Sequence, residues 1–310
     1  MININTIHTD SAKEKHWESL KDLLKIRLNS SSLPVYLKKY IKLNLEEIIT
    51  ALPERLIELN NEFLGTVRGR DKKRYAGRLK KIFKYKGYID EKESKYNAYH
   101  LADNLKINTC PYCNRQYTIT ITGVSNSEKI TRPQFDHYFS QEKYPLLAIS
   151  FYNLIPSCSI CNSTIKHIKE FDLSTHIHPY LEDVITKFKF GYTLATMNRC
   201  KNIKLKYEIC PEKDKIKKTL EDFKLEAIYN GHKFLVDQLL ELKTALNDDY
   251  LEILTRHSYH GLDSWTPEEA YLYAFGTHYE DDKLYLHPFS KLKKDILKSA
   301  AMLSVFDTHK

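Results

Sequence analysis

The sequence is short of cysteine and of long apolar runs, and each shortage excludes a class of protein. Six cysteines in 310 residues are too few for a disulfide scaffold. No run of about 18 apolar residues occurs, so no transmembrane helix is expected. The first residues, MININTIHTD, lack the basic segment and apolar core of a signal peptide. We therefore expect a cytoplasmic protein that does not associate with a membrane.

The positive charge is concentrated in the first third of the chain. The net charge is +8, all of it within residues 1–100. The densest run, residues 71–86 (DKKRYAGRLKKIFKYK), has eight basic residues, one acid and interleaved aromatic residues. Such a surface suits a phosphate backbone, because each neutralised phosphate releases counterions. We take Lys80, Lys81 and Lys84 as candidate nucleic-acid contacts; the alternative is a solvated helix face without a ligand.

The apolar pattern predicts an α+β protein in three regions, with no internal repeat. Residues 1–100 form a basic helical region, and residues 101–183 a β-rich core that includes two CxxC pairs. Residues 184–310 form a β-hairpin followed by helices. With 42% apolar residues the chain can bury a sizeable core.

Helix signals are clearest near the start of the chain. Asp10 or Ser11 can cap a first helix, whose apolar residues recur at helical spacing: Trp17, Leu20, Leu24 and Leu28. The SSSLP segment (30–34) ends that helix, and Pro53 can open a later one. The basic run 71–86 is predicted to be a further helix.

Strand signals follow in the second and third regions. Alternating residues predict strands at 115–123, 187–195 and 203–209, the last two forming a hairpin or two adjacent strands. Residues 130–139 also suit a strand, although Pro133 indicates an edge or a bulge there.

Two CxxC pairs predict a structural zinc site. The pairs are CPYC (Cys110, Cys113) and CSIC (Cys158, Cys161), and together they offer the four thiolates of a closed tetrahedral site. The 44 residues between the pairs are far more than the usual spacing of about 15–20. The alternatives are a thioredoxin-like redox pair, whose βαβ context is missing here, and ordinary buried cysteines. Cys200 and Cys210 are expected to be ordinary buried thiols.

Polar residues within and after this long spacer form a specific series. Asp136 and His137 stand in FDHYF, Asn153 follows in FYNLIP, and Asn162 follows the second CxxC, with Lys166 four residues later. In this order the chain resembles HNH (His-Me finger, ββα-metal) endonucleases whose core is stapled by zinc. The segments CPYCNRQYT, FYNLIPSCSICN, IHPY and PFSKLKKDI also resemble HNH effectors of Septu-type and retron-associated anti-phage defence systems. That wider resemblance covers most of residues 75–300.

The resemblance implies a role for each residue of the series. Asp136 and Asn162 would bind a catalytic Mg²⁺ or Mn²⁺, His137 would be the general base, and Asn153 would orient the histidine or its loop. Hard cations prefer oxygen ligands, and an imidazole with a pKa of about 6.5 suits a base near neutral pH. Lys166 could contact a phosphate. The implied function is cleavage of phage or plasmid DNA beside an ATPase partner.

Several alternatives remain open at this point. Asp136 can be a capping acid, the asparagines can be turn residues, and Lys166 can be a solvated helix lysine. His176 or His178 in THIHPY can replace Asn162 at the metal. The same chemistry can act on RNA, or the chain can be a catalytically silent zinc-stabilised nucleic-acid-binding module. The sequence also lacks a proline two residues after Phe139 and a Gly-Gly turn, both found in many HNH proteins.

Overall fold

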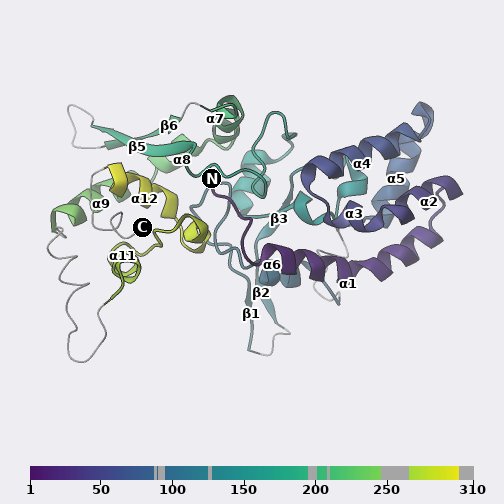
Figure 1. Ribbon diagram of the computed structural model, residues 1–310, viewed down its shortest axis with the longest axis horizontal. Helices are drawn as coiled ribbons and strands as arrows, with labels where there is room; N and C mark the ends of the chain where they lie inside the picture. Colours follow the sequence, from purple (N-terminus) through teal and green to yellow (C-terminus); the bar gives the residue numbers. More distant parts are fainter. Residues whose placement is uncertain are drawn as a thin grey trace. The chain divides into compact units, whose positions relative to one another are not determined.

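The computed structural model describes residues 1–86, 89, 95–124, 128–194, 201–207, 210–245 and 265–299 (Figure 1). Within these ranges the chain combines helices with small antiparallel sheets, which confirms the α+β class. It forms two compact units. The cleft unit comprises Ile4–Ile107 and Thr118–Leu181, and the hairpin unit comprises Met1–Asn3, Asn108–Tyr117 and Glu182–Lys310. No helix among the described residues is both long and apolar enough to cross a bilayer.

The described residues of the cleft unit form six helices: α1 (Thr9–Ser30), α2 (Val35–Leu43), α3 (Leu45–Thr50), α4 (Pro53–Gly65), α5 (Lys72–Ile82) and α6 (Ala98–Leu105). A single 3-10 turn, η1 (Gly69–Asp71), leads into α5. The long helix α1 packs against α2, α3, α5 and α6. Its buried face repeats every four residues through Ala12, His16, Leu20, Leu24 and Leu28, as expected of an amphipathic helix.

The structure confirms some helix predictions and corrects others. The break after Ser30 and the start at Pro53 are confirmed. The predicted caps are wrong, because α1 begins at Thr9 after His8, which makes no side-chain cap bond. Trp17 is half-buried, and His16 takes its place on the buried face. The basic helix ends at Ile82, because Phe83 leaves the helical conformation with its side chain fully buried.

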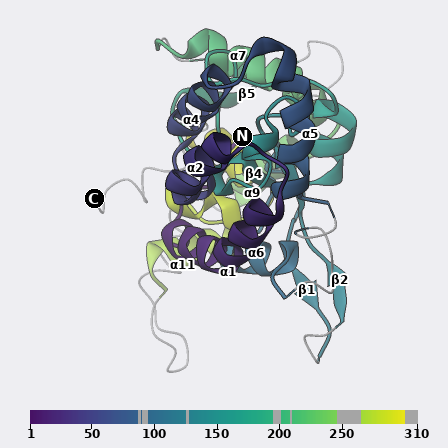
Figure 2. The ribbon, with the colours of Figure 1, turned by 90° about the vertical axis from the view of Figure 1, so that its right-hand side faces the viewer.

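The cleft unit also has two small sheets among its described residues. β1 (Ile121–Thr122) pairs with β2 (Lys129–Thr131), and this hairpin lies beside α6 (Figure 2). β3 (Gln134–His137) pairs antiparallel with β4 (Leu154–Ser157). Pro133 lies between β2 and β3, where it need not donate a ladder hydrogen bond.

Most of the strand predicted at 115–123 is absent from the described structure, and only its end forms β1. Residues 109–117 instead close a turn, in which the Cys110 N–H donates to the Gln116 carbonyl at 3.0 Å. The Thr118 hydroxyl then donates to the Ile107 carbonyl, which directs the chain away from a ladder. A strand pattern was therefore overridden by the turn around the first cysteine pair.

Three short helical turns lie between and after β3 and β4. They are η2 (Pro145–Leu147), η3 (Phe151–Asn153) and η4 (Ile160–Lys166). η4 is a π-helical turn, in which the His167 N–H donates to the Asn162 carbonyl five residues earlier. Such wide turns occur frequently at functional sites.

The hairpin unit contains the predicted strand pair. β5 (Phe188–Leu194) and β6 (Lys201–Tyr207) pair antiparallel, which confirms the prediction (Figure 1). The helices are α7 (Lys213–Asp222), α8 (Leu225–Asn230), α9 (Phe234–Ala245), α11 (Pro267–Phe275) and α12 (Ser290–Ser299), with a 3-10 segment η5 (Asp281–Leu286). α12 packs on β5 through a buried Lys291–Asp295 ion pair, whose carboxylate also accepts the Phe190 N–H.

Candidate functional site

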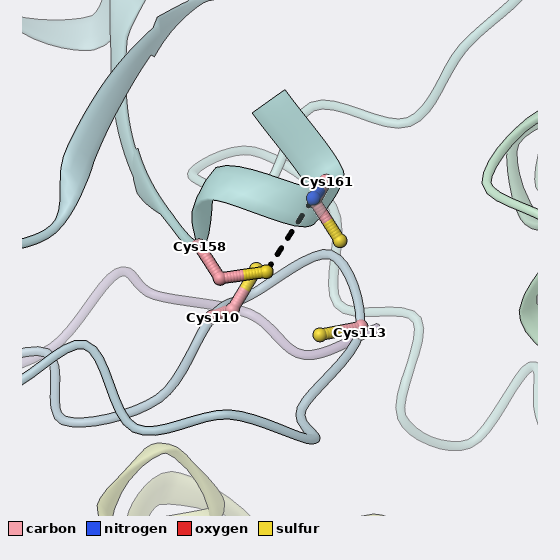
Figure 3. A group of neighbouring side chains, drawn as sticks. All are labelled: Cys110, Cys113, Cys158 and Cys161. Atoms are coloured by element: carbon pink, nitrogen blue, oxygen red, sulfur yellow. Dashed lines mark hydrogen bonds between the residues drawn. The ribbon is translucent and has the colours of Figure 1, made fainter. Parts of the chain in front are cut away.

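Four buried cysteines form a cluster, as the two CxxC pairs predict. The sulfur atoms of Cys110, Cys113, Cys158 and Cys161 all lie within 4.8 Å of one another and gather around one point (Figure 3). A zinc–sulfur bond of about 2.3 Å implies sulfur–sulfur distances of about 3.8 Å in a tetrahedron. The cluster can therefore hold a metal ion such as zinc after a small contraction.

The surrounding backbone supports each cysteine pair. Asn114 follows the first pair with a left-handed φ of 47°, and its N–H donates to the Cys110 carbonyl at 2.7 Å. Its side-chain amide reaches the Leu284 and His287 carbonyls, so the turn is tied to the C-terminal part of the hairpin unit. In the second pair, the Cys161 N–H points at the Cys158 sulfur, 3.4 Å away. A thiolate favours such a donor.

The remaining two cysteines are separate cases. Cys210 is half-buried rather than buried, because it lies at the turn before α7, and it does not belong to the cluster. Cys200 falls outside the described residues.

A cleft of about 570 Å³ opens in the cleft unit beside β3 and η4. Its lining includes four of the residues singled out in the sequence: Asp136, His137, Asn162 and Lys166. Tyr85 and Lys86, which follow α5, and the loop residues 140–142 line it too. The fold thus brings together residues from three separate segments of the chain.

Asp136 and Lys166 form a buried ion pair in this cleft. The Lys166 Nζ lies 2.8 Å from each carboxylate oxygen and 2.6 Å from the His137 carbonyl. Both side chains are almost fully buried, with 6% and 4% of the carboxylate and amine side chains exposed. A solvated helix lysine is therefore the wrong description of Lys166. The buried carboxylate also has its counter-charge at hand, as a buried charge requires.

His137 is fixed in one tautomer by its backbone contact. Its Nε2 lies 2.9 Å from the Ala148 carbonyl, an atom that only accepts hydrogen bonds. Nε2 therefore carries the proton, and Nδ1 keeps the lone pair that a base requires. Burial lowers the pKa of His137 to about 4, against the opposing effect of the Asp136 charge. The imidazole is consequently neutral at neutral pH, and the Tyr85 ring meets it edge-on at 4.8 Å between centroids.

Asn153 acts on the loop that leads away from His137. Its Oδ1 accepts the Phe139 N–H at 2.7 Å, and its Nδ2 donates to the Leu147 carbonyl at 2.8 Å and to the Phe139 carbonyl. Leu147 directly precedes Ala148, whose carbonyl holds His137. Asn153 is fully buried and is not among the cleft-lining residues, so its contacts are those of a positioning residue.

Asn162 is held by a residue that the sequence reasoning missed. Its Nδ2 donates to Gln134 Oε1 at 3.0 Å, which leaves its carbonyl oxygen as the ligand atom. The same Gln134 oxygen accepts the Ser163 hydroxyl. Gln134 stands two residues before Asp136 on β3, so the period of a strand places both on one face. That spacing was the available signal.

Other predicted residues lie elsewhere. His176 stacks on Phe171 at 3.8 Å between centroids, and His178 packs on Tyr138 at 4.3 Å. Both are buried, and neither is among the residues lining the cleft.

The basic run meets the cleft only at its end. The candidate contacts Lys80, Lys81 and Lys84 are exposed, and Lys80 pairs with Glu142 of the cleft loop. It is Tyr85 and Lys86 that reach the lining itself. The exposed lysines therefore extend outward from the cleft along α5 and the turn after it.

Comparison with known protein families, curated proteins and solved structures finds no match to the chain. The functional interpretation consequently depends on the residues of the cluster and the cleft themselves.

Proposed function

We propose that the chain is a metal-dependent HNH endonuclease that hydrolyses phosphodiester bonds in DNA. The observation that carries this proposal is the state of His137. It is half-buried, neutral and anchored through Nε2, and it lines a cleft of about 570 Å³ together with an acid and an amide. A general base requires this combination of a fixed orientation and an open lone pair.

In the proposed reaction, His137 Nδ1 takes a proton from a water molecule. The resulting hydroxide attacks the phosphorus, and the bond to the leaving ester oxygen breaks. Asp136 and Asn162 offer a carboxylate and an amide oxygen, which fit Mg²⁺ or Mn²⁺, and such an ion supplies positive charge for the leaving oxygen. Asn153 keeps the Ala148 carbonyl, and hence the imidazole, in place through its bond to Leu147.

Lys166 has a double part in this proposal. Its ammonium contacts both Asp136 carboxylate oxygens and so holds the carboxylate in one orientation. A phosphate group in the cleft would be a further acceptor for the same ammonium. The ion pair also means that a divalent ion must compete with Lys166 for Asp136.

That competition favours a second candidate, a catalytically silent nucleic-acid-binding module. In such a module, Lys166 would permanently occupy Asp136, and the cleft would only bind. RNA in place of DNA is a variant of the first proposal, since the base and the oxygen ligands act on either backbone.

The four-cysteine cluster completes the proposal as a structural zinc site. We also propose, from the resemblance of the motifs alone, that the chain is an anti-phage effector acting with an ATPase partner on phage or plasmid DNA.

Nicking of supercoiled plasmid in the presence of Mg²⁺ or Mn²⁺ tests the enzyme against the binding module. We expect nicking by the wild type and by His8→Ala, a histidine variant outside the cleft, and nicking that is slower by about 10²–10⁴-fold in His137→Ala. Labelled RNA in the same tube distinguishes the substrates. Full cleavage by a folded His137→Ala protein, free of contaminating nuclease, would remove His137 from the mechanism.

A further inference from the structure

The cleft unit contains a second cavity that the proposed chemistry does not use. It measures about 270 Å³ and lies among α4, the start of α5 and η2. This is just below the range of typical ligand pockets, about 300–1,000 Å³, so the cavity can take only a small group. Most of its wall is apolar or aromatic: Phe63, Leu64, Val67, Tyr75, Leu79 and Pro145. The cavity therefore suits one flat ring system.

One polar side chain in this apolar wall lacks a partner. Asn60 is 3% exposed, and its Nδ2 is buried without a hydrogen bond to any described residue. A buried amide without a partner is costly, so most such groups in proteins are satisfied. The next residue, Asn61, is exposed to solvent, so water can satisfy its amide and no such cost arises.

Three cations surround the cavity. Lys72 and Lys73 from the first turn of α5 and Lys143 from the loop all belong to its lining, and all three are exposed. Lys143 pairs with Glu170, whereas neither Lys72 nor Lys73 has an ion pair within the described residues. The rim is therefore suited to an anionic group attached to the ring.

The cavity and the cleft share two segments. Residues 140–142 line the cleft, and Lys143 and Pro145 of the same loop line the cavity. One face of α5 (Lys72, Lys73, Tyr75, Ala76 and Leu79) lines the cavity, and Tyr85 and Lys86 beyond its end line the cleft. One ligand chain following these segments can thus occupy both sites.

We propose that this cavity binds a single unpaired nucleobase, with the adjoining phosphate on the rim lysines. A base has flat apolar faces for the aromatic wall and a polar edge for the Asn60 amide. That edge is free only when the base is unpaired, so the cavity selects single-stranded over duplex nucleic acid. The base would belong to the strand entering the cleft, and this choice of source rests on the proposed function. A free mononucleotide has the same chemistry.

Binding of a short labelled single strand and of its duplex, with no divalent ion added, tests the proposal. Asn60→Leu should weaken single-strand binding about 2- to 12-fold, the value of one hydrogen bond. Ala76→Phe fills the cavity from α5 and should cost about 5- to 150-fold, the value of one stacked base. The matched control Asn61→Leu should bind as the wild type does. Duplex binding should be unchanged in all three variants.

Folding is checked separately, because Asn60→Leu replaces an unpartnered amide with an apolar group of similar size. Its melting temperature should equal or exceed that of the wild type. Wild-type single-strand affinity in both Asn60→Leu and Ala76→Phe would overturn the proposal and leave the cavity a packing gap.

The outcome is independent of cleavage. Single-strand binding that depends on Asn60 without any nicking supports the cavity and removes the nuclease. Nicking by the wild type, with single-strand binding unchanged in Asn60→Leu and Ala76→Phe, supports the nuclease and removes the base site. Adenosine monophosphate serves as the second probe. Saturable binding of this nucleotide that is lost in Asn60→Leu supports the base site. If single strands nevertheless fail to bind, the ligand is a free nucleotide and the proposal that the base belongs to a strand is overturned.

Discussion

At the scale of single residues, Asp136 and His137 are chain neighbours with different partners. The carboxylate is engaged by Lys166, and the imidazole is engaged by the Ala148 carbonyl. β3 ends at His137, and this end allows both neighbours to line the same cleft although strand neighbours normally point to opposite faces. Their losses should therefore differ in kind.

The lowered pKa of His137 changes the expected pH dependence of cleavage. A base must be neutral, so a pKa of about 4 predicts a rate that is flat from pH 6 to 8 and falls as the pH drops through 4. An ordinary pKa of about 6.5 would instead predict a rise between pH 6 and 7. His137→Ala should lose about 10²–10⁴-fold in rate at neutral pH while keeping its zinc. A pH–rate profile with its midpoint near 6.5 would contradict this account of the burial of His137.

Removal of the Lys166 ammonium should make the protein more dependent on divalent ions. Lys166→Met removes the ammonium that pairs with the buried Asp136 carboxylate, at a cost of about 3–5 kcal/mol of unfolding free energy. Added Mg²⁺ or Mn²⁺ should then raise the melting temperature more than in the wild type. Thermal unfolding with and without the ion measures this difference. Lys169→Met in the same cleft is the control. If added ion raised the melting temperature of Lys166→Met and of the wild type equally, Asp136 would not be a ligand of the ion.

At the scale of elements, α5 and the turn after it connect the exposed basic surface to the cleft. The lysines of this surface carry a charge that a phosphate backbone can neutralise, and contacts of this kind hold for any sequence. Their effect should therefore appear in salt dependence rather than in sequence preference.

Neutralising Lys80, Lys81 and Lys84 together as glutamines should weaken DNA binding for every sequence. The slope of log affinity against log salt should fall by about 0.9 for each phosphate that the variant no longer neutralises. Titrations at several salt concentrations measure both quantities. A charge-matched triple variant on α1 and α2, at Lys25, Lys39 and Lys42, should retain the wild-type slope. Identical salt slopes for both triple variants would indicate that the basic run 71–86 is a solvated helix face that does not contact nucleic acid.

Prediction from the sequence succeeded where a signal was local. Pro53 opens a helix, and alternation identifies the β5–β6 hairpin, because these patterns depend on near neighbours. It failed at 115–120, where the turn around Cys110 competes with the strand. α11 was not predicted, although Thr266, Glu269 and Gly276 form its capping box and its left-handed end.

In the candidate site, too, local signals were predictable and tertiary contacts were not. The members of the series Asp136, His137 and Asn162 were found from residue type and order, and they do line one cleft. The burial of Lys166 and the part played by Gln134 were not predictable, because each depends on the meeting of β3 with η4. Likewise, the sequence could not predict that the Ala148 carbonyl accepts a hydrogen bond from His137 and so fixes its tautomer.

At the scale of the whole molecule, the cysteine cluster joins two segments that lie 44 residues apart in the chain. Everything between them, including β3 and the Asp136–His137 pair, is enclosed by the two anchors. The binding energy of a structural zinc ion is also folding energy, commonly on the order of 10 kcal/mol or more.

Cys113→Ser should therefore give protein that lacks zinc and is insoluble or unfolded, because three thiolates leave the tetrahedron open. Elemental analysis should find about one zinc ion per wild-type chain, and circular dichroism should report the loss of fold in the variant. Cys210→Ser provides the control, since Cys210 is half-buried outside the cluster. A freshly purified, folded wild-type sample without zinc would be incompatible with the zinc site.

The amide of Asn153 has a consequence for engineering. Its hydrogen bonds go to main-chain atoms of Phe139 and Leu147, so these bonds close the loop without depending on the identity of a loop side chain. Gln141 and Glu142 can accordingly be exchanged while the loop keeps its path, provided that Ser140, whose hydroxyl accepts the Glu142 N–H, is retained. Substitutions in this loop can thus change substrate preference without moving the proposed general base.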